Sequence, residues 1–528
     1  MTEEMIKNKN LAVALERFPA GGKIDNVKTD NPAIHIYGKR FYKDQTPVEY
    51  LAEFLLVFAA PKQEDGDEGR YQFNLCCDEN DTPRYWPEDK LALKLFSFFP
   101  SSKLETRHPV HRQAYLDAIE AVKGRINGNK EDKEETVRLI QSLLSGFVGV
   151  AKNRTWVTYS FLPAATGLLG RELVWAHASA KKDQDLKEWE DSAKYFANDR
   201  HIFMARGGEL LFLQLVNLFN QLEHPEIEKL IQDDAYRHLQ EHKLADLNYQ
   251  LEQGLQKMLE SLSSQIDYLI GWVESALDEY KVDLKPKHAN LGWVPSASRT
   301  EALLFAIEMN NICSSKLGTL DKLELMQLLC CMQVLRSLCF QARRVDDSEK
   351  LTEGFIGNFV WIITDPENKP GAPVRQMAQN SFERIEALLY RVIKNIGDKS
   401  AEGSSAEADK HGFQIFRKIS KDIGLVIPQK GSGQRFTLHQ GLLRFLVATL
   451  VRPGKRIRLN HFYQRVFAHY GIALGREQLA VALNWCGNEV DAESYSVTAN
   501  TAWIEEALQQ GGFLVELSDA VSMVKNPG

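Results

Sequence analysis

The apolar residues of segment 244–280 recur in steps of three, four and four, which is the spacing of one face of a helix. The stripe consists of Leu244, Leu247, Leu251, Leu255, Met258, Leu262, Ile266, Leu269, Val273, Leu277 and Tyr280. At about 3.67 residues per turn the stripe stays on one side of a nearly straight helix. We expect a single helix over 225–283, about 85 Å long at 1.5 Å per residue.

This stripe has two possible partners. It can pack inside its own chain as the central helix of a bundle, or it can form a seam with a second copy or another subunit. The sequence leaves both open, so a homo-oligomer formed through the long helix is one of the expected partnerships.

The same apolar spacing predicts a helical body over 116–397. Helices are expected at 112–126, 131–152, 164–179, 185–197, 208–222, 299–316, 320–344 and 374–396. No fixed period of about 30–50 residues stands out, which favours a helical bundle or an irregular helical body over a repeat array.

The first 115 residues predict a small mixed α/β region. Segment 33–41 has the pattern of a strand, and Thr46 is a helix cap followed by Pro47 and Glu49. The fold class predicted for the whole chain is mainly α, with one very long helix and a C-terminal winged-helix-like domain.

The polar segment 398–410 contains no large apolar residue and predicts a linker. Beyond it, 411–528 predicts helices at 411–422, after Thr437 and after Asn460, with Gly471 ending the last of these. A further helix is expected at 476–485, and the tail FLVELSDAVSMVK alternates like a β-hairpin.

This order of elements resembles the winged-helix family. The resemblance implies that the third helix enters the major groove while the hairpin touches backbone or minor groove. The expected third helix departs from this pattern. Its only polar side chains that could contact base edges are Arg476, Gln478 and Asn484, and it also carries Glu477. Contacts that position nucleic acid without reading its sequence are therefore expected.

Charge is distributed unevenly along the chain. The net charge is -7, yet segment 411–476 holds twelve Lys and Arg against the single acid Asp422. A basic block on an acidic body is typical of a DNA- or RNA-binding module. The candidate nucleic-acid-binding residues are Lys430, Arg435, Arg452, Lys455, Arg456, Arg458, Arg465 and Arg476. The alternative is a protein-interaction adaptor whose basic face is merely solvated.

Composition limits the other classes of function. Apolar residues make up 44% of the chain, but no run of 18 uncharged apolar residues occurs, so we expect no membrane span and a cytoplasmic protein. None of the seven cysteines forms a CxxC pair, which favours reduced thiols. No GxxxxGK[ST], GxSxG or GxGxxG motif occurs, and we expect no cofactor.

Three short patterns are candidates for chemistry. His238, Glu241 and His242 match the HxxEH pattern of zinc peptidases, and 88–90 and 367–369 match the E-x-K core of a nuclease signature. The surrounding polar or turn sequence favours chance matches, and no metal site is predicted. Paired glycines beside Arg206 and Glu209 form either an anion site or a tight corner in which these two residues pair.

Two segments and the C-terminal module carry a second resemblance. YGKRFYKDQTPVEYLAEFLLVF and YFANDRHIFMARGGELLFLQL resemble uncharacterised accessory proteins of multigene bacterial antiphage defence loci. The resemblance implies a non-catalytic scaffold and nucleic-acid-binding subunit that works with a helicase, nuclease or ATPase. The remaining alternative is a metal-dependent nuclease or hydrolase.

Overall fold

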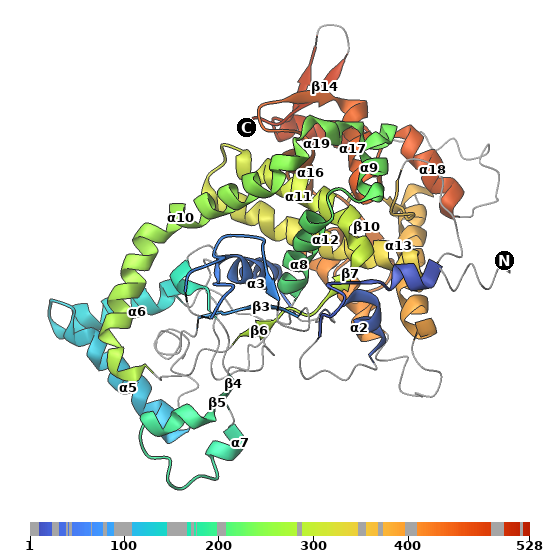
Figure 1. Cartoon of the computed structure of the whole chain (residues 1–528). Helices are drawn as coiled ribbons and strands as arrows, with labels where there is room; N and C mark the ends of the chain where they lie inside the picture. The colour runs from blue at the N-terminus through green and yellow to red at the C-terminus, as the bar shows by residue number, and fades with distance from the viewer. Residues whose placement is uncertain are drawn as a thin grey trace. The chain divides into compact units, whose positions relative to one another are not determined.

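The fold of the protein is mainly helical with a few short strands, which confirms the predicted fold class at this level (Figure 1). The computed structural model describes residues 10–23, 31–38, 41, 45–64, 66–77, 82–88, 108–144, 166–170, 174–175, 177–197, 207–281, 288–346, 355–367, 373–396, 409–486, 501–517 and 521–528. The described residues form two compact units.

The two units are assembled from segments that are distant in sequence. Unit 1 comprises Met1–Pro47, Leu213–Gly254 and Gly292–Gly528, and unit 2 comprises Val48–Phe212 and Leu255–Leu291. This division is interleaved, so it does not follow the sequence order that suggested boundaries at residues 115 and 397. Most of the expected linker, 398–408, lies outside the described residues.

Unit 2 has a helical core and small sheets. Its elements are most of α3 (Pro47–Ala59), β2 (Cys76–Cys77), β3 (Pro83–Tyr85), α5 (Pro109–Gly124), α6 (Lys130–Leu144), η2 (Thr166–Leu168), β4 (Val174–Trp175), α7 (His177–Ala180), η3 (Glu190–Tyr195), β5 (Phe196–Ala197), η5 (Asp278–Tyr280) and β6 (Ala289–Asn290), with the first part of α8 (Gly207–Asn220) and the larger part of α10 (Leu244–Ala276). One core joins Ala118 and Val122 of α5 with Val137 of α6 and Val273 of α10. The apolar stripe of α10 is thus buried within the chain here, as it is at Leu255.

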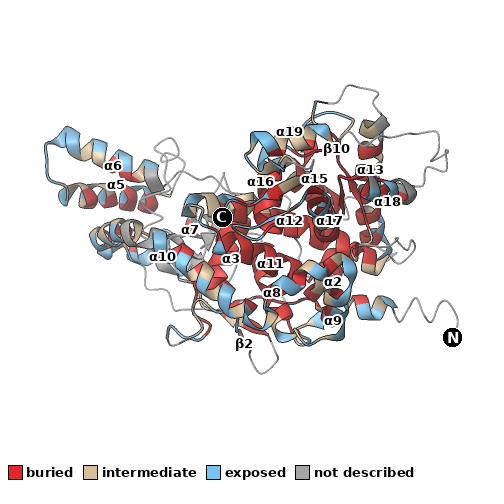
Figure 2. Ribbon diagram, turned by 90° about the horizontal axis from the view of Figure 1, so that it is seen from above, coloured by how far each residue is buried: buried red, intermediate tan, exposed pale blue. Residues whose placement is uncertain are grey.

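Unit 1 is built around two helices that are buried on almost every side (Figure 2). These are α11 (Arg299–Ser314) and α12 (Thr319–Val345). Helix α13 (Pro373–Ile396) packs against α12. By length and composition α12 could span a membrane, but most of its apolar stretch is packed inside the unit, as in the core helix of a globular domain. The preceding elements are β1 (Arg17–Phe18), α2 (Pro32–Tyr37), α9 (Pro225–Gln232), the 3-10 helix η4 (Asp234–Glu241), β7 (Val294–Pro295) and η6 (Ser296–Ser298).

The C-terminal part of unit 1 alternates helices and short strands. Its elements are α15 (Phe413–Asp422), β9 (Val426–Ile427), β10 (Arg435–Phe436), α16 (Gln440–Leu450), β11 (Arg456–Arg458), α17 (Leu459–Tyr470), β12 (Ile472–Ala473), α18 (Arg476–Cys486), α19 (Ala502–Gln510), β13 (Leu514–Glu516) and β14 (Ser522–Lys525). The expected hairpin is present as β13 and β14, and Gly471 ends α17 in the left-handed conformation, with φ 67°. Strand β11 extends the hairpin to a three-stranded antiparallel sheet in the order β11-β14-β13.

This C-terminal part shares its core with the rest of unit 1. Strand β12 pairs in parallel with β8 (Trp361–Ile362), so that Ile472 lies opposite Trp361. The buried Trp361 ring stacks on Phe436 of β10 at a centroid distance of 5.5 Å. Because these contacts cross the expected linker, segment 411–528 is packed onto α13 and β8 as part of one compact unit.

Several sequence predictions of secondary structure are wrong. The expected helix over 225–283 is interrupted, because Asp233 adopts an extended conformation and its side chain caps η4 by accepting a hydrogen bond from the Ala235 N–H. The main helix α10 therefore begins only at Leu244 and is about 50 Å long. Residues 33–37 of the strand expected at 33–41 instead belong to helix α2, since Asn31 caps this helix and Pro32 takes its first position.

A buried ion pair joins the two central helices of unit 1. Both guanidinium NH groups of Arg336 on α12 donate to the Glu308 carboxylate on α11, each over 2.8 Å. Neither side chain has any solvent exposure. Arg336 also donates to the Gln333 side chain and to the His469 carbonyl oxygen, so its polar atoms are held by α11, α12 and α17 together.

We expect the substitution Glu308→Gln to destabilise the protein strongly. It leaves the Arg336 guanidinium buried without an anion, and breaking one side of a buried pair costs about 3–5 kcal/mol. Urea unfolding followed by circular dichroism measures this loss. The double variant Glu308→Leu/Arg336→Met should recover part of it, because neither charge then remains buried while the His469 N–H loses its acceptor.

The surface pair Lys418–Asp422 gives the matched control. Asp422→Asn should change the free energy of unfolding by no more than about 1 kcal/mol, because exposed pairs contribute little. If Glu308→Gln is no more harmful than this control, the buried pair does not stabilise unit 1.

Candidate nucleic-acid interface and the adjoining cavity

Two of the predicted basic residues, Arg456 and Arg458, lie on β11, the edge strand of the three-stranded sheet. Arg456 and Arg458 of β11 are exposed, whereas Ile457 between them is only half-exposed and Val524 opposite it is fully buried. Arg456 is paired with Lys525 of β14, which is also exposed. Since directly opposed residues project from the same face of a sheet, Arg456, Arg458 and Lys525 form one positively charged face.

The turn that leads into this strand is fixed by backbone and amide contacts. Gly454 has φ +73°, a conformation that favours glycine, and its N–H donates to the Asn526 carbonyl oxygen over 3.1 Å. The buried Asn526 side chain donates in turn to the carbonyl oxygen of Val451 over 2.7 Å. The turn therefore holds Lys455 exposed, directly before Arg456.

The other predicted cations are dispersed. Lys430 is exposed in a separate loop, and Arg452 is exposed but donates to the Glu241 carbonyl oxygen over 2.9 Å. Arg465 is only 12% exposed and forms an ion pair with the Glu241 carboxylate at 2.7 Å. Arg476 begins α18, but its side chain lies outside the description.

Arg435 does not lie on the surface as its assignment to a phosphate-binding set requires. It is buried on β10 and donates to the Pro366 carbonyl oxygen over 3.1 Å. Burial, with a smaller contribution from nearby Arg375, lowers the pKa of this guanidinium. Arg435 was predicted from charge alone, and the sequence around it, with Gln434 before it and Phe436 after it, gave no clear signal of its burial.

The helix that we expected to enter the major groove, 476–485, is present as α18, but it is not the helix that directly precedes the hairpin. Gln478 of α18 is buried, and the side chains of Arg476 and Asn484 lie outside the description. Helix α19 comes directly before β13 and contacts both it and α16. Sequence reasoning missed α19, although the spacing of its buried residues Ile504 and Leu508 is helical.

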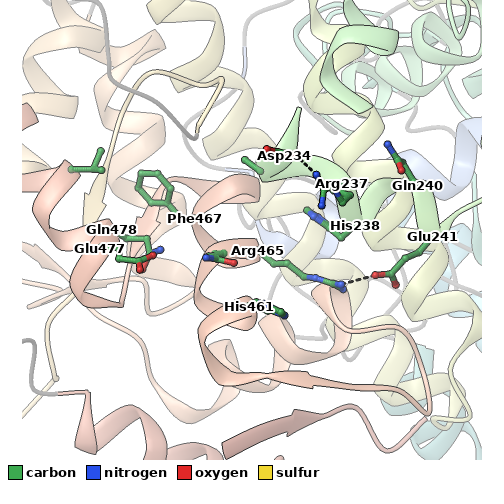
Figure 3. A pocket seen from close by; sticks show the side chains of 13 residues that line it. Asp234, Arg237, His238, Gln240, Glu241, His461, Arg465, Phe467, Glu477 and Gln478 are labelled. Atoms are coloured by element: carbon green, nitrogen blue, oxygen red, sulfur yellow. Dashed lines mark hydrogen bonds and ion pairs between the residues drawn. The ribbon is translucent and has the colours of Figure 1, made fainter. Parts of the chain in front are cut away.

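A cavity of about 840 Å³ lies between η4 and the helices α17 and α18 (Figure 3). Its walls carry two ion pairs, Arg465 with Glu241 and Arg237 with Asp234. The remaining lining residues are Ala235, His238, Gln240, His461, Gln464, Phe467, Glu477, Gln478 and Val481. The walls carry three acids, Asp234, Glu241 and Glu477, against two arginines, and two of the acids are paired with these arginines, so charge alone does not select a ligand for the cavity.

Two histidines connect this cavity to the buried ion pair. The Nε2 atoms of His238 and His469 are 2.8 Å apart, and His469 Nδ1 is 2.6 Å from the Glu308 carboxylate. A hydrogen bond between the two rings needs one N–H and one lone pair, so protonation of both rings would oppose two N–H groups. The arrangement is satisfied when His469 donates to Glu308 and accepts from His238.

The surroundings keep both imidazoles neutral. Burial, followed by the neighbouring His469 and Arg465, lowers the pKa of His238 to about 2. Burial also lowers the pKa of His469, although the Glu308 carboxylate opposes this. Burial alone would raise the pKa of Glu308, but Arg336 and His469 outweigh it and lower the pKa.

Residues of two of the three patterns considered for metal chemistry have other partners in the structure. Among the described residues, no three His, Cys, Asp or Glu side chains are grouped as a metal site requires. In the HxxEH pattern, His238 is bonded to His469 and Glu241 to Arg465. Of the two E-x-K patterns only Glu88 and Glu367 are described, and Glu88 forms an ion pair with Arg70.

The predicted anion or corner site at Arg206 and Glu209 is described only in part. Arg206 lies outside the described residues, and Glu209 is buried and accepts a hydrogen bond from the Tyr85 hydroxyl over 2.8 Å. The Gly208 N–H at the start of α8 donates to the Glu53 carboxylate over 2.6 Å. A carboxylate of the chain itself thus uses one of the N–H groups that an external anion would need.

The chain has no match among protein-family models, curated proteins or solved structures. Its function is therefore argued from the geometry described above.

We expect acid to destabilise the protein through the buried histidines. An imidazole that is neutral in the fold but protonated in the unfolded chain lowers the free energy of unfolding by about 1.4 kcal/mol per pH unit below pH 6.5. His238→Gln removes one such group, so the slope between about pH 6.5 and 5 should decrease by that amount. Urea unfolding at a series of pH values measures the slope.

The lowered pKa of Glu308 also makes the free energy of unfolding decrease in acid, but at lower pH. The stability that the ionised carboxylate contributes is lost only as the pH falls through its pKa in the folded protein. His461→Gln is the matched control, since it removes an exposed imidazole from the same helix, α17. An unchanged slope in His238→Gln would show that His238 is not held neutral in the fold.

Proposed function

We propose that the protein is a scaffold and nucleic-acid-binding subunit that holds phosphate backbone on the basic face of β11 and β14. The observation that carries the proposal is the grouping of Arg456, Arg458 and Lys525 on one exposed face, with Lys455 in the adjoining turn. Lys and Arg side chains bind nucleic acid by neutralising phosphates and releasing counterions.

The arrangement of the C-terminal elements supports a winged-helix-like module. The order along the chain is α16, β11, α17, α19 and the β13–β14 hairpin, with β12 and α18 inserted between α17 and α19. The first strand lies beside the last, in the order β11-β14-β13, and the helices α17 and α19 contact this sheet (Figure 1). In this interpretation α19, and not α18, corresponds to the third helix of the family.

The composition of α19 favours contacts with backbone over reading of base pairs. Its surface carries Glu505 and Glu506, and a carboxylate is repelled by the phosphates that flank a groove. Cations that contact phosphates fix position and orientation but carry little sequence information. We therefore propose binding without strong sequence preference.

The helical body has the role of a scaffold in this proposal. The resemblance to accessory proteins of antiphage defence loci supports a partnership with a helicase, nuclease or ATPase. Most of the described stripe of α10 is covered within the chain, at Leu247, Leu251, Leu255, Met258 and Val273. A seam with a second copy would have to use other residues of this helix, such as the exposed Tyr249 and Tyr268.

We expect the triple variant Arg456→Ala/Arg458→Ala/Lys525→Ala of the full chain to bind nucleic acid weakly. Each lost phosphate contact removes about 0.7–0.9 from the slope of log affinity against log salt, so the magnitude of the slope should decrease by about 2 to 3. Fluorescence anisotropy with labelled duplex and single-stranded oligonucleotides across a salt series measures both affinity and slope.

The matched control replaces three exposed lysines of unit 1 that lie outside the sheet. Lys229→Ala/Lys316→Ala/Lys394→Ala removes the same charge and should retain most of the binding and its slope. Equal losses in both triple variants would mean that net charge, and not the basic face, attracts nucleic acid. Absence of wild-type binding at low salt would contradict the proposal and favour a protein-interaction adaptor.

A further inference from the structure

The basic face of the sheet also carries apolar and aromatic side chains. Strand pairing sets Leu514 opposite Val524, Val515 opposite Met523 and Glu516 opposite Ser522. Continued by one residue, this register brings Phe513 opposite Lys525, whose N–H donates to the Phe513 carbonyl oxygen over 2.8 Å. Phe513, Val515 and Met523 therefore project from the same face as the three cations.

These side chains form two rows across the three strands. The first row is Arg456, Lys525 and Phe513, and the second is Arg458, Met523 and Val515. Neighbouring strands are about 4.8 Å apart, so each row is about 10 Å long and runs from a cation to an apolar side chain. The opposite face of the sheet is turned inward, because its Val524 is fully buried.

The Phe513 ring is supported on one side and half-exposed. It lies against Gly511, where an added Cβ would come within 2.7 Å of the ring. The ring thus packs closely beside the backbone at Gly511, where only a glycine leaves room for it, and it remains partly open to solvent. A supported, half-exposed aromatic ring beside cations is the usual platform for stacking a nucleobase.

We propose that this face binds single-stranded nucleic acid, with a base stacked on Phe513 and the adjoining phosphates on Arg456, Lys525 and Arg458. This inference rests on the proposed function and names its substrate class. In a duplex the bases are stacked on one another inside the helix, so a flat face with an aromatic side chain gains only phosphate contacts. In a single strand each base has a free face, and stacking is tolerant of sequence.

The charge of the neighbouring helix supports this choice. Phosphates of a bulky duplex that approached α19 would meet Glu505 and Glu506. A single strand that crosses the sheet needs only the width of the three strands.

The test compares Phe513→Ala with Val515→Ala in the full chain. Val515 lies on the same strand and face but offers no ring, so it is the matched control. Anisotropy is measured with a labelled oligo(dT), an oligo(U) and a blunt duplex of equal length across the same salt series. We expect Phe513→Ala to weaken single-strand binding about 5- to 150-fold, the usual effect of removing one stacked aromatic side chain, with an unchanged salt slope.

Two further readouts separate stacking from structural damage. Phe513→Tyr keeps the ring and should retain single-strand binding, and the duplex affinity of Phe513→Ala should equal that of the wild type. An oligonucleotide with 4-thiothymidine, crosslinked by light, should attach to the peptide that contains Phe513. The oligo(dT) and oligo(U) arms show whether the strand is DNA or RNA.

The outcomes distinguish this inference from the broader proposal. If Phe513→Ala weakens duplex and single strand equally, or neither, the stacking inference is wrong while phosphate binding by the cations stands. If the wild type binds no nucleic acid at all, both fail. A loss as large in Phe513→Tyr as in Phe513→Ala would also overturn the stacking inference.

Discussion

Unit 1 depends on how the charge of Arg336 is satisfied inside a dry core. Five guanidinium N–H groups have to find acceptors there, and Glu308, Gln333 and the His469 carbonyl provide them. Each acceptor comes from a defined position on α11, α12 or α17, so their geometry fixes the register of three helices at once. A purely apolar interface would allow these helices to slide, whereas a buried charge tolerates few arrangements.

Two histidines link the buried Arg336–Glu308 pair to the cavity by hydrogen bonds. Glu308 accepts from Arg336 and from His469, and His469 is joined to His238 on the wall of the cavity. The interruption between α9 and α10 contributes to this chain of contacts, because η4 carries His238 to its partner. An unbroken helix over 225–283, as the sequence suggested, would not have made this turn.

Apolar periodicity predicted the helices whose environment is uniform along their length. The helices expected at 208–222, 299–316, 320–344 and 374–396 are present within two residues at each end, because buried or amphipathic helices repeat every 3.6 residues. Features that depend on a single residue were missed, such as the cap at Asn31 that makes α2 a helix. The helices expected at 164–179 and 185–197 were predicted wrongly. The described parts of these segments contain only the four-residue helix α7, the 3-10 helices η2 and η3 and the strands β4 and β5.

The basic face was predictable only in part, and for a physical reason. Charge counting found Arg456 and Arg458, but Lys525 lies almost seventy residues further along the chain, and its place beside them depends on strand register. Arg435 was included on charge although it is buried. Phe513 shows the same limit, because an isolated aromatic residue gives no signal until its pairing with Lys525 is known.

The parallel pairing of β8 with β12 has a mechanical consequence. Residues 472–473 immediately follow α17, whose preceding strand is β11, and Trp361 is wedged among the aromatic rings of Phe416 and Phe436. A pulling force on a ligand bound at β11 would therefore be transmitted along α17 to the aromatic core. It would also reach the hydrogen bonds that Arg336 makes to Glu308 and to the His469 carbonyl oxygen. The sheet of β11, β14 and β13 is therefore connected to the core of unit 1 through α17 and β12, so a force on any ligand held by this sheet would act on the whole unit.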